Sequence, residues 1–177
     1  MKGVIVECMS QLVKEKKGEA AWEAILQDVG LAKNTLFLST QDVEDATVMR
    51  VVDSACRVLG QSLADTADAF GTYWITRYAP KIYKIYFGRF QTAREFLLEM
   101  DQLHEKVTQN VPNARPPRFE YETPASQTLI MTYRSDRGML PFFIGLIKGV
   151  GRYFQEDLQV VHLGENRVKV RFPNASP

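Results

Sequence analysis

The sequence predicts an α+β fold, with a helical N-terminal subdomain followed by an antiparallel four-stranded sheet with inserted helices. Up to about residue 110, apolar residues recur at every third or fourth position, the spacing of a helix that buries one face. From about residue 119 they alternate with polar residues, the period of a half-buried strand. Of the 177 residues, 45% are hydrophobic, enough for the core of one domain, which we expect over residues 1–173 with a loose tail at 174–177.

Five helices are expected in the first part of the chain. Each is followed by a glycine or a proline, the residues that most often end a helix. The expected segments are Ile5 to Val13 before Gly18, Trp22 to Val29 before Gly30, Val48 to Leu59 before Gly60, Leu63 to Ile75 before Pro80, and about Thr92 to Gln109 before Pro112.

The later part of the chain contains the four expected strands. Their alternating apolar residues are Phe119 and Tyr121, then Leu129, Met131 and Tyr133, then Leu158 and Val160 up to His162, and finally Val168, Val170 and Phe172. A helix is expected between the second and third strands, from about Leu140 to Phe154. Its Gly145 and Gly149 lie one turn apart and would let another element approach closely.

Composition excludes several classes of function. The net charge is +1, from 22 basic and 21 acidic residues, so no nucleic-acid partner is expected. The longest apolar run, residues 139–147, contains Pro141 and is too short to cross a bilayer, so no membrane insertion is expected. The first residues lack the pattern of a signal peptide, and there are only two cysteines. These features favour a cytoplasmic protein without disulfides.

His104 is a candidate metal ligand. Met100 precedes it by four residues and Val107 follows it by three, so it shares the apolar face of the fifth expected helix. A neutral imidazole in an apolar pocket can bind iron through one ring nitrogen. The alternative is a core histidine that makes one hydrogen bond. His162 has no second ligand at metal-binding spacing, and we expect it at the surface or half-buried.

Tyr133, Ser135 and Arg137 form a candidate carboxylate site. They are spaced two apart, so an extended chain places all three on one face. Together they provide two hydroxyl donors and a guanidinium group, which can hold a carboxylate in a bidentate manner. The alternative is a strand end that carries ordinary polar residues.

In combination, these residues resemble the H-NOX family, the haem nitric oxide/oxygen binding domain of bacterial sensors and of soluble guanylate cyclase. The resemblance covers nearly the whole chain and rests on Leu103-His104-Glu105, the later Tyr133-Arg134-Ser135-Asp136-Arg137, the start Met1 to Ile5, Arg115-Pro116-Pro117, and Phe143 to Ile147. It implies haem b buried between the two parts of the fold. It also implies that His104 is the iron ligand, that Tyr133, Ser135 and Arg137 bind the haem carboxylates, and that Pro117 presses on the haem.

The resemblance also implies which residues form the gas-binding wall. Oxygen-binding members of the family carry a tyrosine at the position of Phe142, which has no hydroxyl to donate. The other implied wall residues are Ile5, Met9, Trp74 and Leu146, and only the indole N–H of Trp74 is a hydrogen-bond donor. The implied ligands are therefore nitric oxide and carbon monoxide, with oxygen excluded. The alternative is that these side chains are simply core.

The implied function is a haem-based gas sensor, not an enzyme, that signals by conformational change. By resemblance, its partner is a histidine kinase, a diguanylate cyclase, or a fused chemotaxis receptor or cyclase domain. A general gas sensor that also binds oxygen and a haem-free binding module remain alternatives. A haem enzyme is a further alternative, but the only spare histidine for acid–base chemistry is His162.

Overall fold

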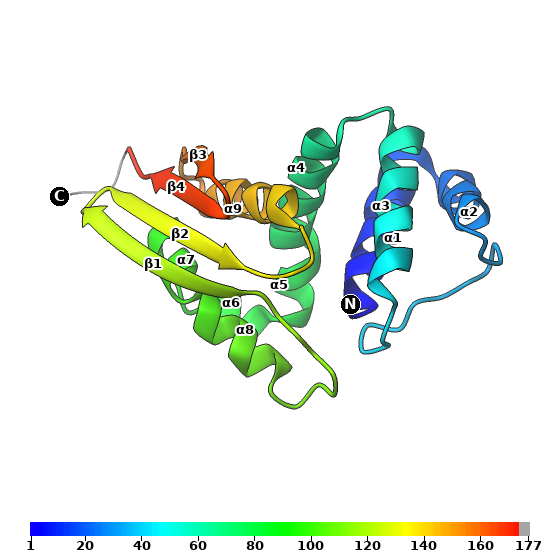
Figure 1. The fold of residues 1–177 in the computed structure, drawn as a ribbon, viewed down its shortest axis with the longest axis horizontal. Coiled ribbons are helices and arrows are strands. Elements are labelled where there is room, and N and C mark those ends of the chain that lie inside the picture. The colour runs from blue at the N-terminus through cyan, green and yellow to red at the C-terminus, as the bar shows by residue number, and fades with distance from the viewer. Residues whose placement is uncertain (174–177) are drawn as a thin grey trace. The chain divides into compact units, whose positions relative to one another are not determined.

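The computed structural model describes residues 1–173 and divides them into two compact units (Figure 1). The first unit comprises residues 1–66 together with 111–115, and the second comprises 67–110 together with the chain from 116 onward. The expected loose tail, residues 174–177, lies outside the described residues. The expectation of one domain over residues 1–173 stays a prediction. In the described part of the chain, no helix has both the length and the apolar character needed to cross a bilayer.

The first unit is helical, as its sequence pattern predicts. Its helices are α1 (Val4–Lys17), α2 (Glu19–Asp28) and α3 (Asp45–Leu59). Each helix buries the apolar face expected from its periodicity, including Met9 and Val13 of α1, Ile25 of α2, and Val51 and Val52 of α3. The first three expected helices are therefore confirmed.

The first residues of the chain are fixed against the segment that precedes α3. The Met1 ammonium group donates to the Val43 carbonyl at 2.6 Å and pairs with the Asp45 carboxylate. Gly3 lies so close to this segment that an added Cβ would stand 2.2 Å from the Leu38 carbonyl oxygen. The start of the sequence thus has a packing role that only glycine at position 3 permits.

The second unit combines a run of helices with the sheet. Helix α4 (Leu63–Tyr73) begins at the end of the first unit and continues into the second. The other helices are η1 (Trp74–Tyr78), α5 (Ala79–Ile82), α6 (Lys84–Phe87), α7 (Ala93–Leu98), α8 (Met100–Thr108) and α9 (Leu140–Phe154).

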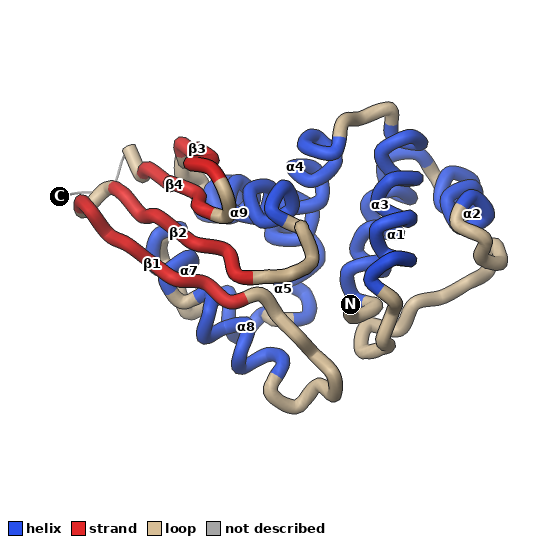
Figure 2. The backbone as a smooth tube through the Cα atoms, viewed as in Figure 1, coloured by secondary structure: helices blue, strands red, loops and turns tan. Residues whose placement is uncertain are grey.

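The sheet contains β1 (Arg118–Ala125), β2 (Thr128–Arg134), β3 (Gln159–Gly164) and β4 (Arg167–Arg171) in the antiparallel order β1-β2-β4-β3. Figure 2 shows these strands together in the second unit. On β2, Leu129, Met131 and Tyr133 are buried while the residues between them are not. One face of the sheet therefore packs on α7, α8 and α9. In Figure 1, α7 and α9 are seen behind the strands and α8 is seen below β1. The expected fold class is confirmed.

The fourth expected helix differs from the prediction beyond Tyr73. There the chain widens into the π-helix η1, and Pro80 lies beyond the end of α4, as expected, but inside a further short helix, α5. Pro80 has no N–H to donate to the carbonyl of Thr76, so the regular hydrogen-bond pattern is interrupted here. The Thr76 hydroxyl also donates back to the Thr72 carbonyl at 2.7 Å, a contact that bends helices.

The fifth expected helix is divided into α7 and α8 at Glu99. At the start of α8, the N–H of Asp101 donates to the hydroxyl oxygen of Tyr121 on β1 at 3.0 Å. The first turn of α8 thus takes a hydrogen-bond acceptor from the sheet, which ends the continuity with α7. Periodicity alone does not reveal such a contact.

Helices α4 and α9 cross at backbone contact, as the two glycines of α9 predict. An added Cβ on Gly145 would stand 2.2 Å from the Ala67 carbonyl oxygen, and one on Gly149 would stand 2.4 Å from the Gly71 carbonyl oxygen. Because glycine is present on both helices, no side chain separates the two backbones at these positions.

Candidate functional site

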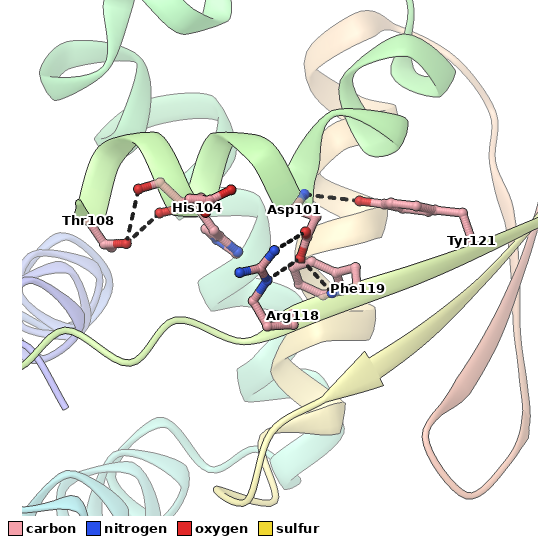
Figure 3. Close-up of polar contacts among 7 residues, drawn as sticks. Asp101, His104, Thr108, Arg118, Phe119 and Tyr121 are labelled. Atoms are coloured by element: carbon pink, nitrogen blue, oxygen red, sulfur yellow. Dashed lines mark hydrogen bonds and ion pairs between the residues drawn. The ribbon is translucent and has the colours of Figure 1, made fainter.

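His104 lies in the second turn of α8, and this helix is attached to β1 through Asp101. The Asp101 carboxylate accepts from Arg118 Nε at 2.8 Å and from Nη2 at 2.6 Å, and its Oδ1 also accepts from the Phe119 N–H at 2.9 Å. Figure 3 shows His104 pointing from α8 toward β1, with the Asp101–Arg118 pair beside it. The helix that carries the histidine is therefore fixed to the sheet three residues before it.

The His104 imidazole lies in an apolar, aromatic environment. Its ring centroid is 5.4 Å from that of Phe119, and its Nδ1 is buried without a hydrogen-bond partner among the described residues. Burial lowers the pKa of His104 to about 4. The negative charge of Asp101 and a hydrogen bond with the Pro117 backbone act in the opposite direction and raise it. The residue as a whole retains some exposure, so it is less enclosed than its apolar helical face predicts. At neutral pH the ring is neutral and has a lone pair available for a metal.

Tyr133, Ser135 and Arg137 come together where β2 ends. Tyr133 is buried, whereas the other two are partly exposed. Burial raises the pKa of the Tyr133 phenol, while a hydrogen bond from Ser135 and the charge of Arg137 lower it. The Ser135 hydroxyl oxygen also accepts from the Arg137 backbone N–H at 3.4 Å. The two hydroxyl groups and the guanidinium group are therefore close enough to act on one another.

A series of aromatic contacts links His104 with Tyr133. The ring of Phe119 on β1 lies 5.0 Å from that of Phe143 on α9, and Phe143 is stacked on Tyr133 at 5.2 Å with an interplanar angle of 16°. Phe119 in turn contacts His104. The candidate metal ligand and the candidate carboxylate site thus share one packed core within the second unit.

A second aromatic group surrounds Phe142, the neighbour of Phe143 on α9. Its ring is 5.2 Å from that of Phe70, which lies 5.8 Å from Trp74. Trp74 is 5.3 Å from Tyr78 at the other end of η1. The structure thus brings Trp74 and Phe142 to the same central residue, and Leu146 lies one turn after Phe142 on α9.

The remaining predicted site residues are distributed as follows. Ile5 and Met9 lie one turn apart on α1 in the first unit, where Met9 is buried and Ile5 partly buried. Pro117 immediately precedes β1, and its backbone is near the His104 ring. His162 is exposed, with its Nε2 at 2.9 Å from the Glu165 carbonyl oxygen, as expected for a histidine outside the site.

Three groups near His104 were not identified as functional from the sequence. They are the Asp101–Arg118 pair, Phe119 and Phe143. Asp101 precedes His104 by three residues, a spacing that places both on one side of a helix and could have drawn attention to it. The partners of Phe119 and Phe143 depend on strand register and helix packing, for which the sequence has no comparable signal.

The residues present fit an iron porphyrin. Such an iron has four ring nitrogens of its own and needs one neutral imidazole from the protein, which His104 can provide. The porphyrin carboxylates need hydrogen-bond donors and a cation, which Tyr133, Ser135 and Arg137 can provide. In residues 1–173, no group of three or more His, Cys, Asp or Glu side chains is placed to hold a metal ion.

Comparisons with known proteins agree with this chemistry. A family model described as haem-NO-binding matches residues 2–162. The chain is 28% identical to soluble guanylate cyclase gcy-37 and 26% identical to soluble guanylate cyclase gcy-31, both of Caenorhabditis elegans, with 90% and 92% of the chain covered. It spans about a quarter of the length of these curated relatives, 23% in both cases.

Solved structures extend the similarity to the fold. A Cs H-NOX mutant superposes with a TM-score of 0.88 at 26% identity, covering 98% of this chain and 97% of that one. An oxygen-binding H-NOX domain related to soluble guanylate cyclases, solved as its oxygen complex, superposes with a TM-score of 0.84 at 26% identity, covering 98% and 96%.

Proposed function

The chain belongs to the haem-NO-binding or H-NOX family, whose domains are haem-binding gas sensors. We propose that it holds haem b, and that it senses nitric oxide and carbon monoxide while excluding oxygen. The observation that carries this proposal is the state of His104. It is a neutral imidazole with a buried Nδ1, held on a helix that is fixed to the sheet. The same unit contains donors that suit the haem carboxylates.

We assign the holding of the haem to five residues. His104 is the iron ligand, and its low pKa keeps the lone pair available at physiological pH. Arg137 pairs with one carboxylate as a charged partner, and Tyr133 and Ser135 add neutral donors. Pro117, whose backbone is near the His104 ring, would press on the macrocycle. When bound, the haem would supply a ferrous iron that can bind a diatomic gas.

The choice of gas is assigned to the side chains around Phe142. Phe142 and Phe70 provide no hydrogen-bond donor, and Leu146 adds an aliphatic group. A donor to bound oxygen, which carries partial negative charge, is worth about 1.5–3 kcal/mol. With phenylalanine at position 142 this donor is missing there, which lowers oxygen affinity about 10- to 150-fold, whereas nitric oxide does not depend on such a donor. The indole N–H of Trp74 is the one donor among the proposed wall residues.

The test is the visible absorption spectrum of the ferrous protein, recorded in air and again with nitric oxide. We expect no stable oxygen complex in air and a new spectrum with nitric oxide. Phe142→Tyr should raise oxygen affinity. A stable oxygen complex in the unmodified protein would contradict oxygen exclusion and favour a general gas sensor. Trp74→Phe would then show whether the indole N–H is the donor, because the variant would lose oxygen affinity.

We further propose that the domain is a sensor and not itself an enzyme, and that it acts on a histidine kinase, a diguanylate cyclase, or a fused chemotaxis receptor or cyclase domain. The curated relatives, which are guanylate cyclases, support an output of the cyclase type. Helix α8 is a suitable element to carry the signal, because it bears His104 and is attached to β1 by Asp101.

A further inference from the structure

The chain between α4 and α7 has an unusual distribution of charge. Residues 69–94 contain five basic residues and no acidic residue, although the whole chain has nearly equal numbers of the two, 22 and 21. The basic residues are Arg77, Lys81, Lys84, Arg89 and Arg94. The charge balance of the whole chain conceals this local excess.

Within this stretch, the sequence Lys-Ile-Tyr occurs twice in succession, at residues 81–83 and 84–86. The two tyrosines are partly buried against the core of the second unit, and the following Phe87 is buried against Phe96 at 5.0 Å. The lysines and isoleucines are exposed, with Ile82 at 50% and Ile85 at 83%. The tyrosines thus fix α5 and α6 in place and leave a Lys-Ile surface, Lys81, Ile82, Lys84 and Ile85, facing solvent.

The lysines of this surface take part in no ion pair with any residue from 1 to 173. Two exposed aliphatic side chains next to two exposed lysines have the composition of a small interface that combines apolar and charged contacts. We propose that the Lys-Ile surface is a docking surface for an acidic, amphipathic helix of the signalling partner. This proposal rests on the sensor function proposed above.

A protein partner fits this surface better than a membrane does. Helices α5 and α6 have four residues each, and together they expose only two isoleucines. Membrane attachment grows with the apolar area that a helix inserts, and two short turns provide little of it. A partner helix with carboxylates beside an apolar stripe can contact both isoleucines and both lysines at once. On such a partner helix, side chains three residues apart lie on the same side, so its apolar and acidic side chains form two adjacent rows.

The surface is also connected to the gas-binding side chains. Helix α5 follows η1 without an intervening loop, and η1 begins at Trp74. Trp74 contacts Phe70, which contacts Phe142. A shift of the side chains around the bound gas would therefore reach α5 through a single helical connection, and the docking surface would respond to the ligand.

The test uses the full chain and a fluorescent synthetic helical peptide with leucines along one face and glutamates along the other. Its twin carries lysine in place of every glutamate. By fluorescence anisotropy, we expect the acidic peptide to bind at least about tenfold more tightly than its twin, and added salt to weaken that binding. We expect Lys81→Glu/Lys84→Glu and Ile82→Ser/Ile85→Ser each to reduce acidic-peptide affinity at least about tenfold.

Matched controls make the same changes at other exposed positions. Lys16→Glu/Lys17→Glu carries the same change of charge, and Leu36→Ser/Leu38→Ser removes the same kind of exposed aliphatic group. Both should bind the acidic peptide as the unmodified chain does. Equal binding of the two peptides, or equal losses in the control and test variants, would overturn the proposal.

Vesicles of phosphatidylcholine and phosphatidylserine provide the membrane arm. If the chain binds these vesicles through Lys81 and Lys84 and does not bind the acidic peptide, the surface recognises lipid and the proposal is wrong. The absorption spectrum with nitric oxide is recorded for every variant. It should remain unchanged, because none of the substituted side chains belongs to the proposed gas site. Failure of docking and failure of gas sensing are thus observed separately.

Discussion

The low pKa of His104 predicts that this residue destabilises the haem-free chain in acid. The unfolded chain takes up a proton near pH 6.5, whereas the folded chain does so only near pH 4. Above pH 6.5 both states are neutral at this position and there is no penalty. As the pH falls below 6.5, the unfolded state alone gains the proton and folding stability is lost, until the loss levels off below pH 4. The full effect is about 3 kcal/mol, of which about 2 kcal/mol is lost between pH 7 and pH 5.

Urea unfolding of the haem-free chain, followed by circular dichroism at pH 7, 6 and 5, measures this effect. Other groups titrate in the same interval, so the informative quantity is the difference between the unmodified chain and His104→Leu. As the pH falls from 7 to 5, the unmodified chain should lose about 2 kcal/mol more of its free energy of unfolding than His104→Leu does. His162→Gln, at an exposed position, is the matched control and should follow the unmodified chain. If the difference in free energy of unfolding between His104→Leu and the unmodified chain is the same at pH 7, 6 and 5, the reasoning is refuted.

Three further predictions concern the haem site. His104→Gly should yield protein without haem, and added imidazole should restore the haem absorption band; normal haem loading without imidazole would exclude His104 as the ligand. Arg137→Ala should lower haem occupancy more than Ser135→Ala, because it removes a charged partner of a carboxylate, worth about 1.5–3 kcal/mol, rather than one neutral donor; equal and negligible losses would reject the carboxylate site. Asp101→Asn should weaken haem retention and lower the melting temperature more than Glu120→Gln, which alters the exposed Glu120–Arg134 pair between β1 and β2. The opposite order would show that Asp101 does not position α8.

The sequence predicts best those elements whose pattern is local. The expected helix from Leu140 to Phe154 has the bounds observed for α9, because Pro141 marks its start and its apolar face is continuous. The strand that contains Tyr133 also follows its alternation. His104 and the three donors at the end of β2 are recognisable because each depends on residue type and short spacing.

Features that depend on distant contacts could not be predicted in this way. The break before α8 depends on a hydroxyl group that Tyr121 brings from β1. The role of Asp101 depends on Arg118, and that of Phe143 depends on the register that places Tyr133 opposite Phe119. Each of these contacts forms only when the sheet has assembled on the helices, so no window of sequence contains both partners.

Helix α9 connects the two halves of the proposed site through neighbouring residues. Phe143 packs on Phe119 and Tyr133, the aromatic contacts that reach His104, whereas Phe142 packs on Phe70, next to Trp74. Successive side chains on a helix point about 100° apart, so a rotation of α9 displaces both groups together. Where α9 crosses α4, Gly145 and Gly149 lie directly against the backbone of α4, so no side chain at these two positions can absorb that displacement. A change at the gas-binding side chains would therefore be passed both to the surroundings of His104 and to the helix that leads into α5.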